Sequence, residues 1–260
     1  MTNIKIGFIG FGSMAMAIAE GLIKFNAVSA HNIYACAKHH DKLKINADKL
    51  GISACFDAKT VISNCDIIIP AIVPSIAEEV LKPLSDDLCG KAVVSIMHGI
   101  LFDKLEELLP GSHHISTLPN TPVKVGEGIL ICENKHSLSG NELNLFREVF
   151  EKIAIIEFVD EKALSVAGTI SGCAPAFTAI YIEALADAGV EFGLTRETAY
   201  RLASKMIAGT GKLSLESQLH PGMLKDAVCS PGGTTIRGIA ALEKNAFRGT
   251  VISAIEAIEK

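Results

Sequence analysis

The segment best suited to chemistry is Ser-Pro-Gly-Gly-Thr-Thr at residues 230–235, which directly precedes a run with helical spacing. Glycine permits positive φ and close approach of a ligand, and the first turn of a helix presents N–H groups without helical partners. Gly232, Gly233 and Thr234 therefore predict an anion site fit for a carboxylate. The hydroxyls of Thr234 and Thr235 can bond to a substrate heteroatom. A Ser/Thr-type helix cap after a turn is the alternative.

A second candidate site lies near the N-terminus, where residues 10–15 form the pattern G-x-G-x-x-A between a strand-like and a helix-like segment. In this pattern Gly10 permits a tight turn, Gly12 lets the backbone approach a pyrophosphate, and small Ala15 lets helix pack on strand. The helix start at Ser13 and Met14 adds N–H groups and partial positive charge. The motif predicts dinucleotide binding, with a plain tight turn as the alternative.

The segment after the second predicted strand, residues 35–40, favours NADP(H) over NAD(H). It has the sequence Ala-Cys-Ala-Lys-His-His and lacks the carboxylate that would hold the ribose hydroxyls of NAD. Lys38 and the loop amides can accept a 2′-phosphate, and a solvated loop is the alternative. His39 and His40 are adjacent, and adjacent histidines rarely converge on one ion, so we expect no metal.

The elements that position these residues alternate between strand and helix in the first part of the chain. Strands are predicted at 4–10, 32–37, 65–73, 92–97 and 114–119, with a helix from Met14 to Phe25. Ile67, Ile68 and Ile69 are apolar on both faces of their strand, as in a parallel sheet covered by helices on each side. Residues 1–160 therefore predict a doubly wound, Rossmann-like α/β domain that binds a dinucleotide.

Beyond residue 160 we expect only helices. Residues 176–193 carry an apolar stripe that ends at Gly193, Thr195 is suited to cap the next helix, and two helices follow residues 230–235. Residues 161–260 are predicted to form an all-helical domain for substrate binding and dimerisation. So small and apolar a domain cannot cover its own faces, so we expect a homodimer through the C-terminal helices.

The composition limits the partners of the chain. Its 260 residues are 49% hydrophobic and 20% charged, with a net charge of −5 and no basic run, so neither nucleic acid nor membrane is an expected partner. Seven cysteines without a C-x-x-C pair predict reduced thiols, mostly in the core, and a cytoplasmic protein. Gly7, Gly10 and Gly12 interrupt the apolar N-terminus, so no signal peptide is expected.

An uncharged span from Ala163 to Ile182 is long enough to suggest a membrane helix. Gly168, Gly172 and Pro175 interrupt it, together with several hydroxyl residues, which makes it too polar and too broken for a bilayer span. We therefore expect a helix buried by protein on all sides.

Taken together, these segments resemble the pyrroline-5-carboxylate reductase family over nearly the whole chain. The matching segments are IGFIGFGSMA (6–15), YACAK (34–38), LPNTP (118–122), SGCAPAF (171–177), EALADAG (183–189) and HPGMLKDAVCSPGGTTIRGIAALE (220–243). The last block is highly specific to the family, whereas the G-x-G-x-x-A pattern alone is not.

The resemblance implies a fold, a reaction and a set of site residues. It implies a Rossmann-like domain and an interlocking helical domain, dimers that often assemble into decamers, and reduction of 1-pyrroline-5-carboxylate to L-proline by NADPH or NADH, the last step of proline biosynthesis. By motif, the substrate carboxylate would lie against Ser230, Gly232, Gly233 and Thr234, and Thr235, the catalytic candidate, would bond to the ring nitrogen. The cofactor would use Gly12, Ser13 and Met14, with Pro119 and Asn120 close by.

Three residues depart from the family pattern. Val73 stands where a lysine is usual at the cofactor rim, His98 where a small residue is usual, and Cys173 where a serine is usual. We expect His98 to pack at a strand end, with a contact on the nicotinamide side of the cleft as the alternative.

Two other functions are compatible with the motifs. One is a related imine reductase or β-hydroxyacid dehydrogenase, although residues 168–175 supply no lysine of the kind that hydroxyacid enzymes use. The other is a non-catalytic, regulatory protein that binds a dinucleotide.

Overall fold

The computed structural model describes residues 3–260, which divide into two compact units, one up to Gly172 and one from Cys173 to Lys260. We call them the sheet unit and the helical unit. The domain boundary expected at 160/161 coincides with the end of the last strand at Val159 and the start of a helix at Glu161, whereas the compact units divide after Gly172.

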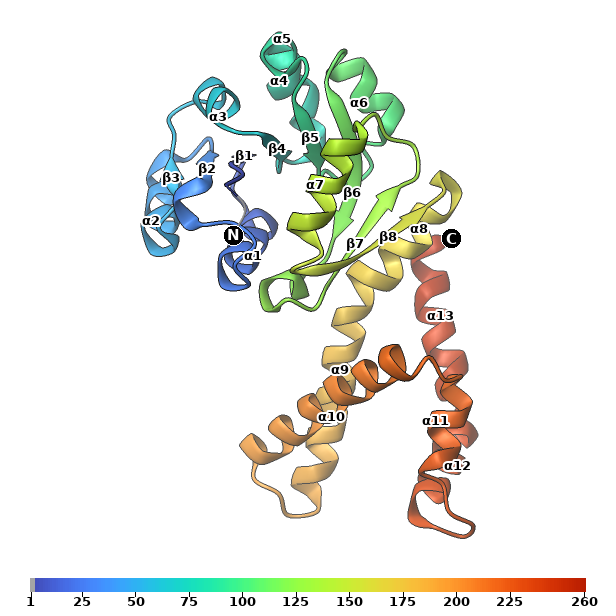
Figure 1. Cartoon of the computed structure of the whole chain (residues 1–260). Helices are drawn as coiled ribbons and strands as arrows, with labels where there is room; N and C mark the ends of the chain where they lie inside the picture. Colours follow the sequence, from blue (N-terminus) through green and yellow to red (C-terminus); the bar gives the residue numbers. More distant parts are fainter. Residues whose placement is uncertain (1–2) are drawn as a thin grey trace. The chain divides into compact units, whose positions relative to one another are not determined.

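The sheet unit is built on eight strands in the described residues (Figure 1). The strands are β1 (Ile6–Ile9), β2 (Ile33–Cys36), β3 (Ser53–Ala54), β4 (Ile67–Pro70), β5 (Ala92–Ser95), β6 (His113–Pro119), β7 (Gly128–Glu133) and β8 (Ala154–Val159). Their order is β3-β2-β1-β4-β5-β6-β7-β8, and every neighbouring pair is parallel except β6 and β7. The predicted doubly wound α/β class is confirmed.

The chain changes direction across the sheet at β1. After β1 it builds β2 and β3 on one side, and then crosses to β4 on the other, so that Ile6 pairs with both Ile33 and Ile67. Ligands of open α/β sheets bind outside the carboxyl ends of the strands at such a switch point. The turn at residues 10–12, which follows β1, lies at this point.

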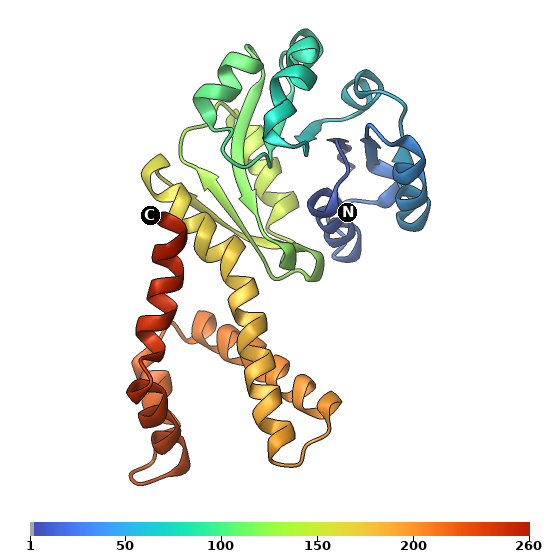
Figure 2. The same ribbon diagram turned by 180° about the vertical axis from the view of Figure 1, so that it is seen from behind.

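Helices cover both faces of the sheet (Figure 2). They are α1 (Ser13–Lys24), α2 (His40–Leu50), α3 (Ala58–Asn64), α4 (Ala77–Leu81), α5 (Ser85–Leu88), α6 (Phe102–Leu108), α7 (Gly140–Phe150) and α8 (Glu161–Gly168). One core packs α1, α2 and α7 against Ile67 and Ile69, and the other packs α3 to α6 against Ile68. The two-faced burial predicted for residues 67–69 is therefore confirmed.

Strands β3, β7 and β8 were not predicted. Strand β3 has only two residues and no pattern of its own. Strand β8 is an edge strand in which Ile155 is 52% exposed and Glu157 interrupts the apolar run, so its pattern is weak. Strand β7 follows a short 3₁₀ segment, η4 (Thr121–Val125), and turns back along β6 as its antiparallel neighbour. This antiparallel return without an intervening α-helix departs from the alternation of strands and helices on which the sequence prediction was based.

The helical unit contains no strand in its described residues, as predicted. Its helices are α9 (Ala174–Glu191), α10 (Arg196–Ser217), α11 (Pro221–Ala227), α12 (Thr234–Lys244) and α13 (Phe247–Glu259). Gly193 has φ +97 just after α9, and the Thr195 hydroxyl accepts a hydrogen bond from the Thr198 N–H at 3.3 Å to cap α10. Both predicted helix boundaries are confirmed.

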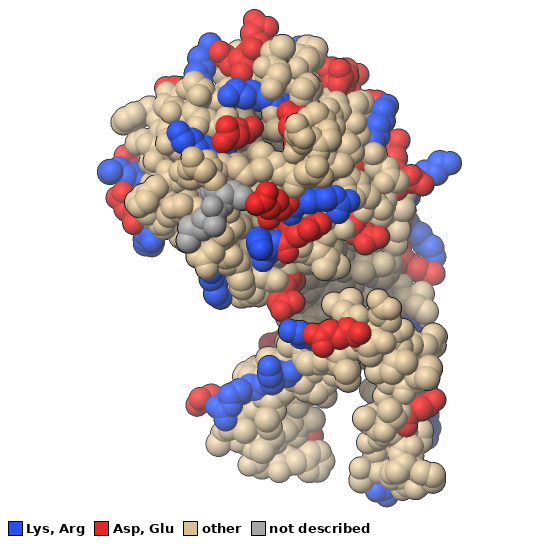
Figure 3. Space-filling view, in the orientation of Figure 1, with Lys and Arg blue, Asp and Glu red and all other residues tan. Residues whose placement is uncertain are grey.

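The helical unit leaves much apolar surface exposed, and on the face shown in Figure 3 large uncharged areas lie between its charged side chains. Large apolar side chains at least 45% exposed include Ile180, Leu202, Met206, Leu213, Leu215, Met223, Val228, Val251 and Ile252. Glu161–Glu191 is long and apolar enough to cross a membrane, yet only 17% of its most apolar window is buried. The expectation of a helix buried by protein on all sides is therefore wrong for the described residues of the single chain, because most of this window is exposed.

Candidate functional site

The turn after β1 requires glycine at position 10. Gly10 has φ +89, and its N–H donates to the carbonyl of Cys36 at 2.8 Å, which ties the end of β1 to the end of β2. A Cβ at this position would lie 2.5 Å from the carbonyl oxygen of Ala71. Position 10 therefore shapes the turn and brings the carboxyl ends of β1, β2 and β4 close together.

Gly12 has a different environment, because a Cβ there would meet no atom within 4 Å. It is the N-cap residue of α1, and no side chain caps that helix, so its first N–H groups are open to a ligand. Ala15 is 1% exposed and packs in the core, as the motif predicts. A depression of about 270 Å³ lies beside this helix start, lined by Gly12, Ser13, Met14, Ala15, Ala71, Ile72, Val73, Pro74 and Ile96. No charged side chain among the described residues lines it, so an anion there would depend on the helix start.

A second depression, of about 390 Å³, lies on the β2 and β3 side of the turn. Its lining residues are Ile9, Gly10, Cys36, Ala37, Lys38, Phe56, Asp57, Ala58, Ile72, Ile76, Glu79 and Val80. Lys38 is the one cationic side chain in this lining, and Asp57 and Glu79 are the carboxylates. Asp57 caps α3: hydrogen bonds from the backbone and hydroxyl of Thr60 keep its pKa below the ordinary value. Asp57 therefore stays ionised in the same lining as Lys38.

The loop between β5 and α6 is held from β6. The Thr117 hydroxyl donates to the carbonyl of Ser95 at 2.8 Å, and the Ser116 hydroxyl donates to the carbonyl of Ile100 at 3.0 Å. Ile96, in the same loop, lines the first depression. Strand β6 therefore positions one wall of the dinucleotide site through its hydroxyl side chains.

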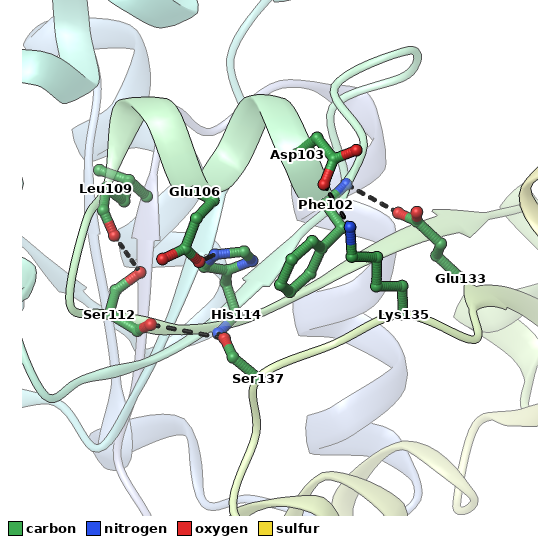
Figure 4. Close-up of polar contacts among 9 residues, drawn as sticks. All are labelled: Phe102, Asp103, Glu106, Leu109, Ser112, His114, Glu133, Lys135 and Ser137. Atoms are coloured by element: carbon green, nitrogen blue, oxygen red, sulfur yellow. Dashed lines mark hydrogen bonds and ion pairs between the residues drawn. The ribbon is translucent and has the colours of Figure 1, made fainter.

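A polar cluster fixes the start of α6 behind this loop (Figure 4). Glu133, at the end of β7, is 3% exposed and accepts a hydrogen bond from the Phe102 N–H at 2.8 Å. Burial raises the pKa of Glu133, and the bond from Phe102 opposes this shift. The Lys135 ammonium lies 4.7 Å from the centre of the Phe102 ring and pairs with Asp103. Glu133 thus satisfies a helical N–H that would otherwise lack a partner.

His114 is a second buried titratable side chain of this cluster. Its Nε2 lies 2.8 Å from Oε2 of Glu106, and its Nδ1 is buried without a hydrogen-bond partner among the described residues. Burial lowers the pKa of His114 below 6.5, and the bond to Glu106 only partly opposes this. The neutral imidazole, donating from Nε2–H to the Glu106 carboxylate, is therefore the native form.

We predict that acid destabilises the sheet unit through His114. Because its pKa is lower folded than unfolded, protons favour the unfolded chain, and stability falls as the pH drops below 6.5 toward the folded value. The free energy of unfolding changes by at most about 1.4 kcal/mol per pH unit through this one group. Urea unfolding between pH 8 and 5.5, above the range of ordinary carboxylates, measures this. The His114→Leu variant should show a flatter pH dependence, and an unchanged slope would contradict the assignment.

Asn120 is buried and bonded at both ends of its carboxamide. Its Oδ1 accepts from the Ile129 N–H at 2.8 Å, and its Nδ2 donates to the carbonyl of Ser171 at 2.9 Å. That carbonyl is available because Pro175, four residues on, has no N–H to donate, and the chain forms a π-helical turn at Thr169–Cys173. Neither Asn120 nor Pro119 lines the two depressions, so their predicted closeness to the cofactor stays a prediction.

Residues 230–235 form the turn and helix start that the sequence predicts. The Gly233 N–H donates to the carbonyl of Ser230 at 3.0 Å, with Pro231 and Gly232 (φ +67) between them, as in a type II turn. The Gly233 N–H is thus engaged inside the turn, and the first N–H groups of α12, at Thr234 and Thr235, remain without a side-chain cap. Both threonines are exposed.

One expectation about a single residue is wrong, and the expectation that most cysteines lie in the core holds for four of the seven. His98 does not pack at a strand end, because it is exposed in a turn whose next residue, Gly99, has φ +78. Of the seven cysteines, Cys36, Cys55, Cys65 and Cys132 are buried as expected, but Cys89 and Cys173 are exposed and Cys229 is half-buried. Val73, at the rim of the first depression, is 64% exposed.

The glycine turn at the switch point of a parallel sheet, followed by a helical unit, defines a dinucleotide-dependent oxidoreductase of the Rossmann type. A family model described as NADP oxidoreductase, coenzyme F420-dependent, matches residues 5–99, and one described as pyrroline-5-carboxylate reductase dimerisation matches 161–260. The pyrroline-5-carboxylate reductase of Treponema pallidum is 42% identical over 98% of this chain and 98% of its own length. The chain belongs to the pyrroline-5-carboxylate reductase family.

Other relatives agree over nearly their full length. The pyrroline-5-carboxylate reductase of Escherichia coli is 36% identical over 96% of this chain and 94% of its own. Among solved structures, the Plasmodium falciparum pyrroline carboxylate reductase with NADP bound is 34% identical, covers 99% of this chain and 96% of its own, and superposes with a TM-score of 0.86. The similarity therefore extends over both units.

Proposed function

We propose that this protein reduces 1-pyrroline-5-carboxylate to L-proline with NADPH, as a pyrroline-5-carboxylate reductase of proline biosynthesis. The observation that carries the proposal is the turn at residues 230–235, in which a glycine with positive φ leads into an uncapped helix bearing two exposed threonines. Relatives that bear the name of this activity match the chain over nearly its whole length.

The sheet unit fits NADPH, which supplies the hydride when bound. The open space at Gly12 and the start of α1 suit the pyrophosphate, with Ser13 and Met14 in the first turn. In this proposal Lys38 binds the 2′-phosphate, and Asp57 and Glu79 in the same lining set how strongly it does so. The solved relative with NADP bound supports this choice of cofactor.

The helical unit supplies the groups for the substrate. The N–H groups of Thr234 and Thr235 and the hydroxyl of Ser230 are suited to the carboxylate, while Gly232 and Gly233 shape the turn that leaves room for it. The Thr235 hydroxyl hydrogen-bonds the ring nitrogen and orients the C=N bond for hydride addition. Since a cyclic imine is basic enough to protonate partly in water, orientation contributes more than a strong acid would.

We also propose a homodimer that covers the apolar helices, further assembly into decamers, and a cytoplasmic location. The match of residues 161–260 to a dimerisation model and the exposed apolar side chains of the helical unit support self-association. The window within Glu161–Glu191 that is 17% buried would then be covered by a second copy rather than by lipid.

An assay with purified protein tests the proposed reaction. NADPH oxidation, followed by absorbance, should require pyrroline-5-carboxylate and should be weak with 1-pyrroline, which lacks the carboxylate. Equal rates with both imines would favour a general imine reductase, and oxidation of a β-hydroxyacid by NADP would favour the hydroxyacid enzymes. No turnover of any of them by a folded protein that binds NADPH would leave a non-catalytic, regulatory binder.

A further inference from the structure

Phe56 is an exposed aromatic side chain whose position packing does not explain. It is 85% exposed, and it and Val73 are the two most exposed of the large apolar side chains described in the sheet unit. It stands between β3 and α3, directly before the capping residue Asp57. An apolar residue at that position often packs back onto the first turn of the helix, but such high exposure shows that Phe56 does not.

A second ring holds Phe56 in place. The imidazole of His40, the first residue of α2, stacks on the Phe56 ring with the centroids 4.1 Å apart and an interplanar angle of 17°. The Nδ1 of His40 is buried without a hydrogen-bond partner in the described part of the chain, so the contact of His40 with Phe56 is the ring stack alone. The segments that follow β2 and β3 thus bring the rings of His40 and Phe56 together.

The Phe56 ring lines the second depression, together with Lys38 and Ala58. In folds of this type the residues that follow the second strand hold the adenosine ribose, so this side of the turn receives the adenosine half of a dinucleotide. Exposed aromatic rings bind bases by stacking, because every base has a π-face. The depression therefore combines a flat apolar ring with one cation and two carboxylates, Asp57 and Glu79. The ring suits the adenine of a nucleotide, and Lys38 is the group of this lining that suits its phosphate.

We infer that Phe56 is the platform on which the adenine of NADP stacks, and that His40 is a positioning residue that holds the platform. The inference rests on the proposed cofactor, and it assigns two residues that the glycine motif does not include. Lys38 contacts the 2′-phosphate and Phe56 the base, so that both ends of the 2′-phosphoadenosine group are recognised in one depression.

Calorimetric titration with 2′,5′-ADP, which carries the adenine and the 2′-phosphate but no nicotinamide, tests the platform. Phe56→Leu keeps apolar bulk but removes the flat ring, and it should weaken binding about tenfold, within the range of base–aromatic stacking. Phe56→Tyr should bind as the wild type does. Since the side chain is exposed, the melting temperature should not change in either variant. Equal affinity of Phe56→Leu and wild type would overturn the inference.

The proposed role of His40 in holding the Phe56 ring is tested by His40→Ala, with His39→Ala as the control. His40→Ala should weaken 2′,5′-ADP binding by a smaller factor than Phe56→Leu, whereas His39→Ala, which removes an exposed side chain with no ring partner, should not. In NMR spectra, the adenine H2 and H8 signals of bound 2′,5′-ADP should move upfield in wild type and less in Phe56→Leu. Absence of that difference would contradict stacking.

This test separates the inference from the proposed reaction. Reduced nicotinamide mononucleotide lacks adenine, so its kcat/KM in the imine assay should be the same for wild type and Phe56→Leu. Loss of 2′,5′-ADP affinity in Phe56→Leu supports the platform even if the imine is not reduced. A wild type that reduces the imine but shows no stacking would retain the function and overturn the platform.

Discussion

Gly12→Ala should weaken NADPH binding by about 100-fold, equivalent to about 3 kcal/mol, without destabilising the sheet unit. Gly12 has φ −83 and ψ −169, a conformation open to alanine, and a Cβ there would meet no protein atom within 4 Å. The protein therefore tolerates the methyl group, but the cofactor does not, because the methyl group occupies the space in which the pyrophosphate approaches the backbone. Calorimetry measures the dissociation constant, and thermal unfolding measures the stability.

Gly10→Ala is the matched control, and it should have the opposite profile. Its Cβ would lie 2.5 Å from the carbonyl oxygen of Ala71, at a backbone φ of +89 that alanine rarely adopts. The strain should cost about 1–3 kcal/mol and lower the melting temperature of the protein without cofactor. If Gly12→Ala lowered the melting temperature as much as Gly10→Ala and left NADPH affinity intact, the division of roles between the two glycines would be wrong.

The parts of the site that are local in sequence could be predicted. Gly10, Gly12 and Ala15 belong to one turn and one helix start, whose requirements follow from backbone geometry alone. The same holds for the turn before α12, where Pro231 and Gly232 define the geometry. The Gly233 N–H is the exception: its bond to Ser230 follows from the turn type, and the prediction of an anion-binding N–H overlooked it.

The parts that depend on tertiary contacts could not be predicted. The carboxamide of Asn120 finds its partners in β7 and in the π-helical turn, 9 and 51 residues away in sequence. The stack of His40 on Phe56 depends on β2 and β3 being parallel neighbours, and β3 is too short to recognise from sequence. His98 was expected to pack because it follows an apolar strand, but Gly99 allows a turn that leaves the imidazole in solvent.

The exposed apolar faces of the helical unit are another feature that the sequence could predict only in part. An apolar stripe in a sequence indicates that a face is covered, but not which chain covers it. For α9 the stripe was recognised, yet Ile180 is 65% exposed in the single chain, and Leu202 of α10 is 55% exposed. The proposed dimer would cover these faces, so measured stability should rise with protein concentration if the dimer forms.

Thr235→Ala should lower kcat/KM for pyrroline-5-carboxylate by about 100-fold while leaving the dissociation constant for NADPH unchanged. Thr235 lies in the first turn of α12 and is exposed, and alanine is a better helix former than threonine, so the fold should tolerate the change. The loss would come from the hydroxyl that orients the C=N bond, an interaction that strengthens as the hydride is transferred.

Two further substitutions at this position isolate the hydroxyl from the shape of the side chain. Thr235→Ser keeps the hydrogen bond and should retain most of the activity, whereas Thr235→Val keeps the volume and should behave like alanine. Single-turnover kinetics with saturating NADPH separates the chemical step from product release. If valine were as active as threonine, the ring nitrogen would be oriented by another group, and the first turn of α12 would bind the carboxylate alone. The two ends of the substrate are thus tested separately, since removal of the carboxylate in 1-pyrroline probes the helix start and Thr235→Val probes the nitrogen.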